Sequence, residues 1–130
     1  MEYTPEIITH LAPNEIFVFG TNQYAKHGGG AAVIASREFG AKYGESPIGL
    51  VGNTYGIITT SFNDVPVSIE FIRSQIETLY YFALLRPDLK FYVTKIGTGI
   101  AGFSIDEIKS VFRLTFKPNN IILPIEFSKH

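Results

Sequence analysis

Short, largely apolar segments that suit β-strands alternate along this chain with segments that suit helices, and this alternation limits the fold more than any other feature. The predicted strands cover residues 15–20, 55–62, 90–96 and 119–127. They are apolar on both faces rather than at every second residue, which is typical of strands that helices cover on both sides. The order predicts an α/β fold with three α/β/α layers, in which helices lie on both faces of a mostly parallel sheet.

Helices are expected in the segments between these strands. The first covers residues 31–44, and the third covers residues 104–116. The second begins after Ser68, which acts as its N-cap, and ends before Pro87. Its apolar face follows spacings of three and four residues. That face consists of Ile69, Ile72, Ile76, Leu79, Tyr80 and Ala83.

The composition is that of one folded domain spanning residues 1–130. Hydrophobic residues make up 45% of the chain, which is enough to form a core in a domain of this length. Eleven basic and 12 acidic residues give a net charge of −1, so direct binding of duplex nucleic acid through many phosphates is not expected. There is no cysteine, and the histidines lack metal-ligand spacing. No apolar run approaches the ~20 residues of a membrane span. We therefore expect a cytoplasmic protein without metal, cofactor or membrane contact.

Two glycine-rich loops follow predicted strands, at residues 21–30 and 97–103, and each leads into a predicted helix. The carboxyl ends of parallel strands meet at one edge of a sheet, and ligands bind there. Glycine lets the backbone approach a ligand closely, and unpaired amides at the start of a helix attract anions. The two loops together predict an anion-binding crevice lined by amides, which needs no net positive charge.

The second loop also matches the GxGxxG pattern from Gly97 to Gly102. A dinucleotide-binding site needs this pattern after the first strand and an acidic residue about 20 positions later. Here the pattern follows the third predicted strand, and residues 120–124 contain no acidic residue. We therefore reject a NAD-dependent dehydrogenase. The acidic residues after the loop are explained by a helix start, since Ser104 and Glu107 have the spacing of a capping box and Asp106 lies in the first turn.

The two loops resemble those of the macrodomain, the ADP-ribose-binding module, over about residues 15–124. The resemblance implies that Asn22 meets the distal ribose, that the second loop wraps the diphosphate with its amides, and that Phe103 packs on the distal ribose. It also implies ADP-ribose or a related small nucleotide as the ligand and ADP-ribosylated macromolecules as further partners. The ligand-binding residues expected from it are Gly20, Thr21, Asn22, Gly28, Gly29, Gly30, Gly97, Thr98, Gly99, Ile100, Ala101, Gly102 and Phe103.

The amino-terminal segment departs from this pattern. Many macrodomains read the adenine amino group with an aspartate in a Gly-Asp-Ile-like turn, and we find no such turn in residues 1–15. Asn14 and Glu15 are the substitutes that the sequence offers. The chain therefore resembles a short, divergent member of the family.

The first loop holds the side chains expected to carry any hydrolysis of ADP-ribose conjugates. Asn22 would orient the distal ribose or a water molecule, and His27 and Lys26 are the ionisable groups beside it. Asn22 also suits a turn after the strand, and Lys26 and His27 also suit a solvated loop. Asp64, which follows the second predicted strand, is an outside candidate for a catalytic or ribose-binding carboxylate.

Two further functions are consistent with the same loops. One is a non-enzymatic binding or sequestering protein for another phosphate-containing nucleotide signal, which the missing adenine-reading turn favours. The other is RNA binding, which the balanced charge argues against.

Overall fold

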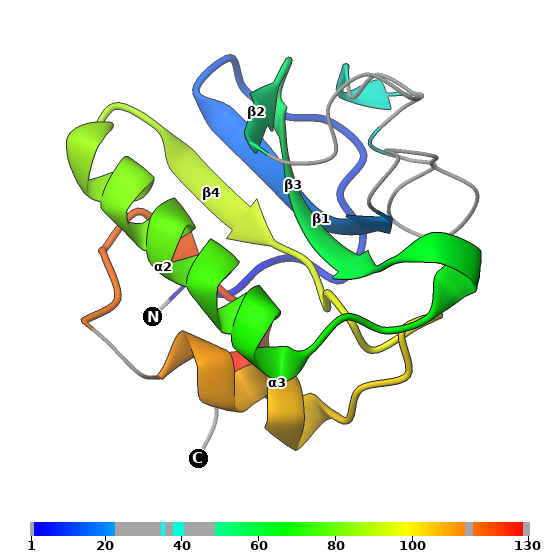
Figure 1. The fold of residues 1–130 in the computed structure, drawn as a ribbon. Coiled ribbons are helices and arrows are strands. Elements are labelled where there is room, and N and C mark those ends of the chain that lie inside the picture. Colours follow the sequence, from blue (N-terminus) through cyan, green and yellow to red (C-terminus); the bar gives the residue numbers. More distant parts are fainter. Residues whose placement is uncertain (1, 23–34, 36–37, 41–48, 114–115, 129–130) are drawn as a thin grey trace.

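The computed structural model describes residues 2–22, 35, 38–40, 49–113 and 116–128. In this part of the chain the strands form one sheet in the order β2-β3-β1-β4-β5 (Figure 1). The strands are β1 (Glu15–Asn22), β2 (Gly49–Val51), β3 (Thr54–Thr60), β4 (Lys90–Val93) and β5 (Ile121–Ile122).

The sheet is mixed. Strand β1 lies at its centre and pairs in parallel with β3 and β4, and β4 pairs in parallel with β5. Strand β2 is antiparallel to β3, and the two-residue turn between them contains Gly52 at φ +59°. The sequence prediction missed β2 because its three residues are too few to show a strand pattern.

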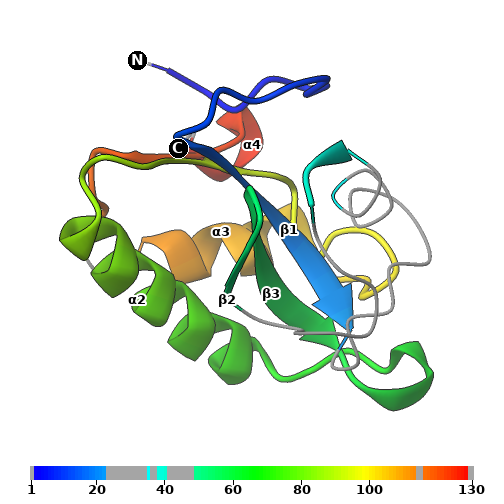
Figure 2. The same cartoon turned by 90° about the horizontal axis from the view of Figure 1, so that it is seen from above.

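One face of the sheet is covered by helices α2 (Ile69–Leu85), α3 (Ile105–Phe112) and α4 (Ile125–Ser128) (Figures 1 and 2). Ser68 caps α2 by accepting a hydrogen bond from the Phe71 amide, as predicted. All three helices contribute apolar side chains to one core with the strands. The α/β class is therefore confirmed.

The opposite face of the sheet has a smaller apolar cluster. Phe17 and Phe19 of β1 pack there with Ala35 and Phe39, and partly buried residues of the amino-terminal segment, Ile8 and Leu11, complete the cluster. Most of the helix predicted at residues 31–44 lies outside the described residues. A second complete helical layer therefore stays a prediction.

Several predicted helices and strands extend further than the observed ones. Phe39 and Gly40 are not helical, so the helix expected up to residue 44 stops earlier, and Gly40 adopts φ +91°. Strand β4 ends at Val93 because the chain turns directly into the glycine loop. The strand predicted at residues 119–127 was wrong over most of its length. Only two residues pair with β4, and α4 begins after Pro124.

Tyr80 connects α2 to the end of α3. Its hydroxyl is buried and donates a hydrogen bond to the Phe112 carbonyl oxygen at 2.8 Å, where a helix leaves carbonyls without partners. We expect Tyr80→Phe to lower the free energy of unfolding by about 1–2 kcal/mol, because the carbonyl stays buried and unpaired. Urea unfolding measures this. The control is Tyr81→Phe at the neighbouring exposed position, which should change stability by less than about 0.5 kcal/mol.

The same contact makes stability depend on alkaline pH. Burial raises the pKa of the Tyr80 phenol well above its ordinary value of 10.0. The unfolded chain therefore loses this proton first, and the contribution of Tyr80 is complete below pH ~10 and is lost as the pH rises further. If Tyr80→Phe retains the stability of the wild type, the hydrogen bond contributes nothing to the fold.

Candidate functional site

The two glycine loops leave neighbouring strands at the centre of the sheet. After β1 the chain returns to the sheet at β2 and β3 on one side, and after β4 it returns at β5 on the other side. Loops that diverge in this way from adjacent parallel strands leave a crevice at their carboxyl ends. From this topology we expect the crevice between the end of β1 and the segment 94–104.

The starts of the two loops are in contact. Both the amide and the Oγ1 of Thr94 donate to the Val18 carbonyl oxygen, at 3.0 and 2.9 Å. A Cβ built on Gly20 would lie 3.2 Å from Thr59 Oγ1 and 3.6 Å from the Gly97 amide nitrogen. The tight contact at position 20 is therefore with Thr59 of β3, and the second loop lies at van der Waals distance from the end of β1.

The second loop is held by internal hydrogen bonds. Thr98 Oγ1 donates to the Lys95 carbonyl at 2.8 Å, and the Phe103 amide donates to the Gly97 carbonyl at 2.9 Å. The Gly102 amide donates to the Gly99 carbonyl at 3.0 Å. The predicted capping box follows at once and is confirmed in both directions. The loop is therefore a folded turn rather than a flexible linker.

The three glycines of this loop are present for different structural reasons. Gly97 and Gly102 adopt φ +75° and +78°, which explains them by backbone conformation alone. Gly99 has no positive φ, and a Cβ built there meets no atom of the described residues within 4 Å. Within the described part of the chain, neither backbone conformation nor packing explains glycine at position 99.

Unpaired amides lie at the same point. Within the described part of the chain, the amides of Gly99, Ile100 and Ala101 donate to no protein acceptor. The Ile100 side chain is 70% exposed, so this stretch is open to solvent. Consecutive unpaired backbone amides are groups that can donate hydrogen bonds to an anion such as a phosphate.

The first loop is described only at its start. Asn22 ends β1 opposite Thr60, beyond an irregularity in the register after Thr21, and its side chain is half-buried. Thr21 is buried. The other predicted residues of this loop lie outside the described residues. They are Lys26, His27, Gly28, Gly29 and Gly30.

Asp64 lies in a tight turn after β3. It adopts φ +60° beside Asn63 at φ +59°, and the turn is closed by the Ser61 amide, which donates to the Val65 carbonyl at 2.7 Å. Asparagine and aspartate tolerate this left-handed conformation better than other non-glycine residues. Turn geometry therefore explains Asp64 without a catalytic role. Asp106 is likewise in the first turn of α3, as predicted.

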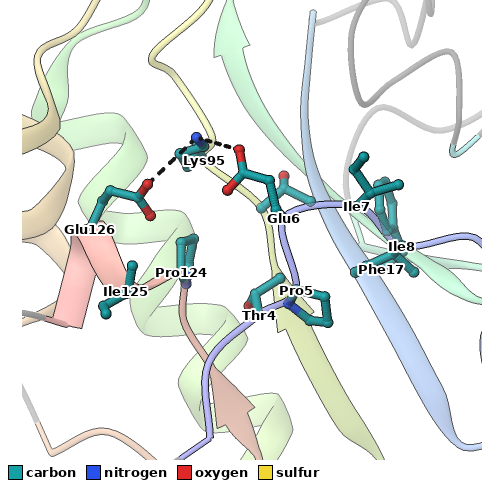
Figure 3. A pocket seen from close by; sticks show the side chains of 11 residues that line it. Thr4, Pro5, Glu6, Ile7, Ile8, Phe17, Lys95, Pro124, Ile125 and Glu126 are labelled. Carbon is teal, nitrogen blue, oxygen red and sulfur yellow. Dashed lines mark hydrogen bonds and ion pairs between the residues drawn. The ribbon is translucent and has the colours of Figure 1, made fainter.

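A pocket of about 310 Å³, which the sequence reading missed, adjoins the start of the second loop (Figure 3). Its apolar walls come from the amino-terminal segment, β1 and the start of α4. Its lining residues are Thr4, Pro5, Glu6, Ile7, Ile8, Phe17, Thr94, Lys95, Pro124, Ile125 and Glu126. The segments "PEII" and "PIEF" each place a carboxylate beside proline and isoleucine, but no local sequence pattern connects them.

The polar groups of this pocket form an ion triad. Lys95 Nζ lies 3.3 Å from Glu6 Oε1 and 3.6 Å from Glu126 Oε2 (Figure 3). Glu6, through its hydrogen bond, is the main cause of the raised pKa of Lys95, and the charge of Glu126 adds to it. The positive charge of the lysine is balanced by one of the two carboxylates, so the triad carries a net charge of −1. The pocket therefore favours groups that donate hydrogen bonds over anionic groups.

The sequence offered Asn14 and Glu15 as substitutes for an adenine-reading residue. Both lie far from the second loop. Both are at the amino end of β1, whereas the crevice is at its carboxyl end. Asn14 donates to the Asp88 carbonyl, and Glu15 accepts from the Ala12 amide at 2.8 Å.

Comparison with known proteins supports the fold. No family model matches the chain, and no curated protein matches it. A solved structure of a protein of unknown function from Bacteroides thetaiotaomicron is similar, with a TM-score of 0.59 and 13% sequence identity. The similarity covers 83% of this chain and 82% of that chain, so the two share a fold over most of their lengths. None of the described helices is long and apolar enough to cross a membrane.

Proposed function

We propose that this protein binds ADP-ribose or an ADP-ribose-derived nucleotide across the crevice between the loop after β1 and the loop 97–103. The observation that carries the proposal is Gly99, which has an ordinary backbone conformation, an open space where a side chain would stand, and unpaired amides after it. A diphosphate accepts hydrogen bonds from such amides without needing a lysine.

The adjoining pocket supports a ligand with an aromatic base next to its phosphates. Its size suits a base, and its apolar walls suit the flat faces of one. An adenine amino group would donate to the carboxylate of Glu6 or Glu126. The distal ribose would then extend toward Asn22, at the end of the neighbouring strand β1.

Release of ADP-ribose from modified macromolecules is a second activity at this same site. It is favoured by the position of Asn22 at the carboxyl end of β1, where the starts of the two loops touch. Hydrolysis needs the anomeric carbon and a water molecule to be held in line, which a fixed amide side chain can provide.

Calorimetric titration with ADP-ribose tests the proposed function. The comparison ligands are AMP, ribose 5-phosphate and a cyclic dinucleotide, each at up to millimolar concentration. ADP-ribose should give the tightest binding. Absence of heat and of a thermal shift with ADP-ribose would refute the proposal, and tighter binding of the cyclic dinucleotide would favour a sequestering protein for another signal.

Binding should weaken only modestly with salt. Phosphates held by amides release no counterion from the protein, and the lysine beside the pocket is already paired with two carboxylates. We expect the logarithm of the association constant to fall by less than about one unit for each tenfold rise in salt, compared with almost one unit per phosphate contact when lysines bind nucleic acid. The measurement is the titration repeated from 50 mM to about 500 mM sodium chloride. A steep slope would mean that charged side chains hold the phosphates.

A further inference from the structure

The ion triad joins two parts of the chain that are far apart in sequence. Glu6 belongs to the amino-terminal segment, which packs on β1 through Ile8 and Leu11, and Glu126 belongs to α4 (Figure 3). Lys95 lies between them, at the start of the second loop. Its backbone carbonyl also accepts the hydrogen bond from Thr98 Oγ1, so one residue contacts both the pocket and the loop.

Without Lys95 the two carboxylates would repel each other across the pocket. The amino-terminal segment is attached on both sides of Glu6. Before it, the Thr4 amide donates to the Leu123 carbonyl at 2.8 Å and Thr4 Oγ1 donates to the Ile122 carbonyl at 3.0 Å. After it, Ile8 packs on β1. The Glu6 side chain itself is 75% accessible, and within the described part of the chain its carboxylate pairs only with Lys95.

We propose that Lys95 is a specificity-determining residue that fixes Glu6 and Glu126 on the two sides of the pocket as hydrogen-bond acceptors, so that the pocket selects rings presenting an amino group. This inference rests on the proposed function, because it concerns the base of the same nucleotide. A ring that lacks the amino group would leave the carboxylates without this hydrogen-bond donor.

The ion pairs suit this role because a ligand group can replace the lysine at one of the carboxylates. All three side chains are at least one-third exposed, and ion pairs of this kind contribute little to stability. A donating amino group can therefore take one carboxylate while the lysine keeps the other. The triad positions acceptors rather than holding the fold together.

The test compares ADP-ribose with the analogue in which unsubstituted purine replaces adenine, so that the two ligands differ only in a hydrogen atom in place of the amino group. The wild type should prefer ADP-ribose by roughly 30-fold, and Lys95→Met should reduce this ratio to below about fivefold. Lys95→Arg, which keeps the charge, should retain the preference. The matched control is Lys90→Met, since Lys90 pairs with Glu2 on the same amino-terminal segment at 2.7 Å but does not line the pocket.

The outcomes separate this inference from the proposed function. A wild type that binds ADP-ribose without preferring it overturns the inference alone, as does an unchanged ratio in Lys95→Met. Equal loss of preference in Lys90→Met and Lys95→Met also overturns it, because Lys95 would then only fasten the amino-terminal segment. A wild type that binds neither ligand overturns both.

Discussion

Replacing Gly99 by valine is expected to weaken ADP-ribose binding at least ~100-fold while leaving the free energy of unfolding within about 0.5 kcal/mol of the wild type. The fold should tolerate the change because the backbone at Gly99 has no positive φ and a Cβ there meets no atom of the described residues within 4 Å. Binding should not tolerate it, because the branched side chain would occupy the space beside the unpaired amides. Loss of two charge-assisted hydrogen bonds to a diphosphate accounts for about 3 kcal/mol.

Gly97→Val is the matched comparison in the same loop. Gly97 adopts φ +75°, and a Cβ there would lie 2.8 Å from Ile108 Cδ1. This variant should lose about 2 kcal/mol of stability through backbone strain at positive φ and displacement of the Ile108 side chain. Calorimetry with ADP-ribose and urea unfolding on both variants separate the two effects. Normal ligand affinity in a folded Gly99→Val protein would remove the observation on which the proposed function rests.

The general architecture was predictable because local signals and tertiary packing agree there. Ser68 and Ser104 mark helix starts by spacing and chemistry alone, and both caps are present. The apolar stripe from Ile72 to Ala83 identifies the buried face of α2, and those residues are in the core. The second glycine loop was likewise visible as a change of residue type between a strand and a capping box.

The parts that sequence reasoning missed depend on contacts between distant segments. The carboxyl-terminal apolar run reads as a strand by residue type, but Pro124 ends the pairing and Phe127 is buried in the core from a helix. The ion triad joins residues 6, 95 and 126, which no local pattern connects. Gly97 and Gly99 are the same residue type, so the sequence cannot show that only Gly97 needs glycine for its backbone conformation. The backbone angles and the neighbouring atoms are needed to distinguish them.

Asn22→Ala is expected to remove at least ~100-fold of any ADP-ribose-releasing activity, because orienting the reacting groups is worth several kcal/mol of barrier. Asn22 stands at the end of β1, directly after the residues that touch the second loop. The second loop offers no alternative catalyst, since residues 97–103 contain no side chain that titrates near neutral pH. The measurement is release of ADP-ribose from modified protein and from modified nucleic acid, with thermal unfolding as the check on folding.

His27→Ala and Asp64→Ala decide whether the first loop carries the chemistry. Loss of a modest general base costs on the order of 10²-fold, so His27→Ala should be impaired but no more than Asn22→Ala. Asp64→Ala should remain active, because the turn geometry after β3 explains the aspartate. An inactive Asp64→Ala beside a fully active Asn22→Ala would move the reaction to the end of β3. If the wild type releases ADP-ribose from neither substrate but binds it, the amides near Gly99 and the pocket beside Lys95 serve recognition, and the first loop has no reaction to catalyse.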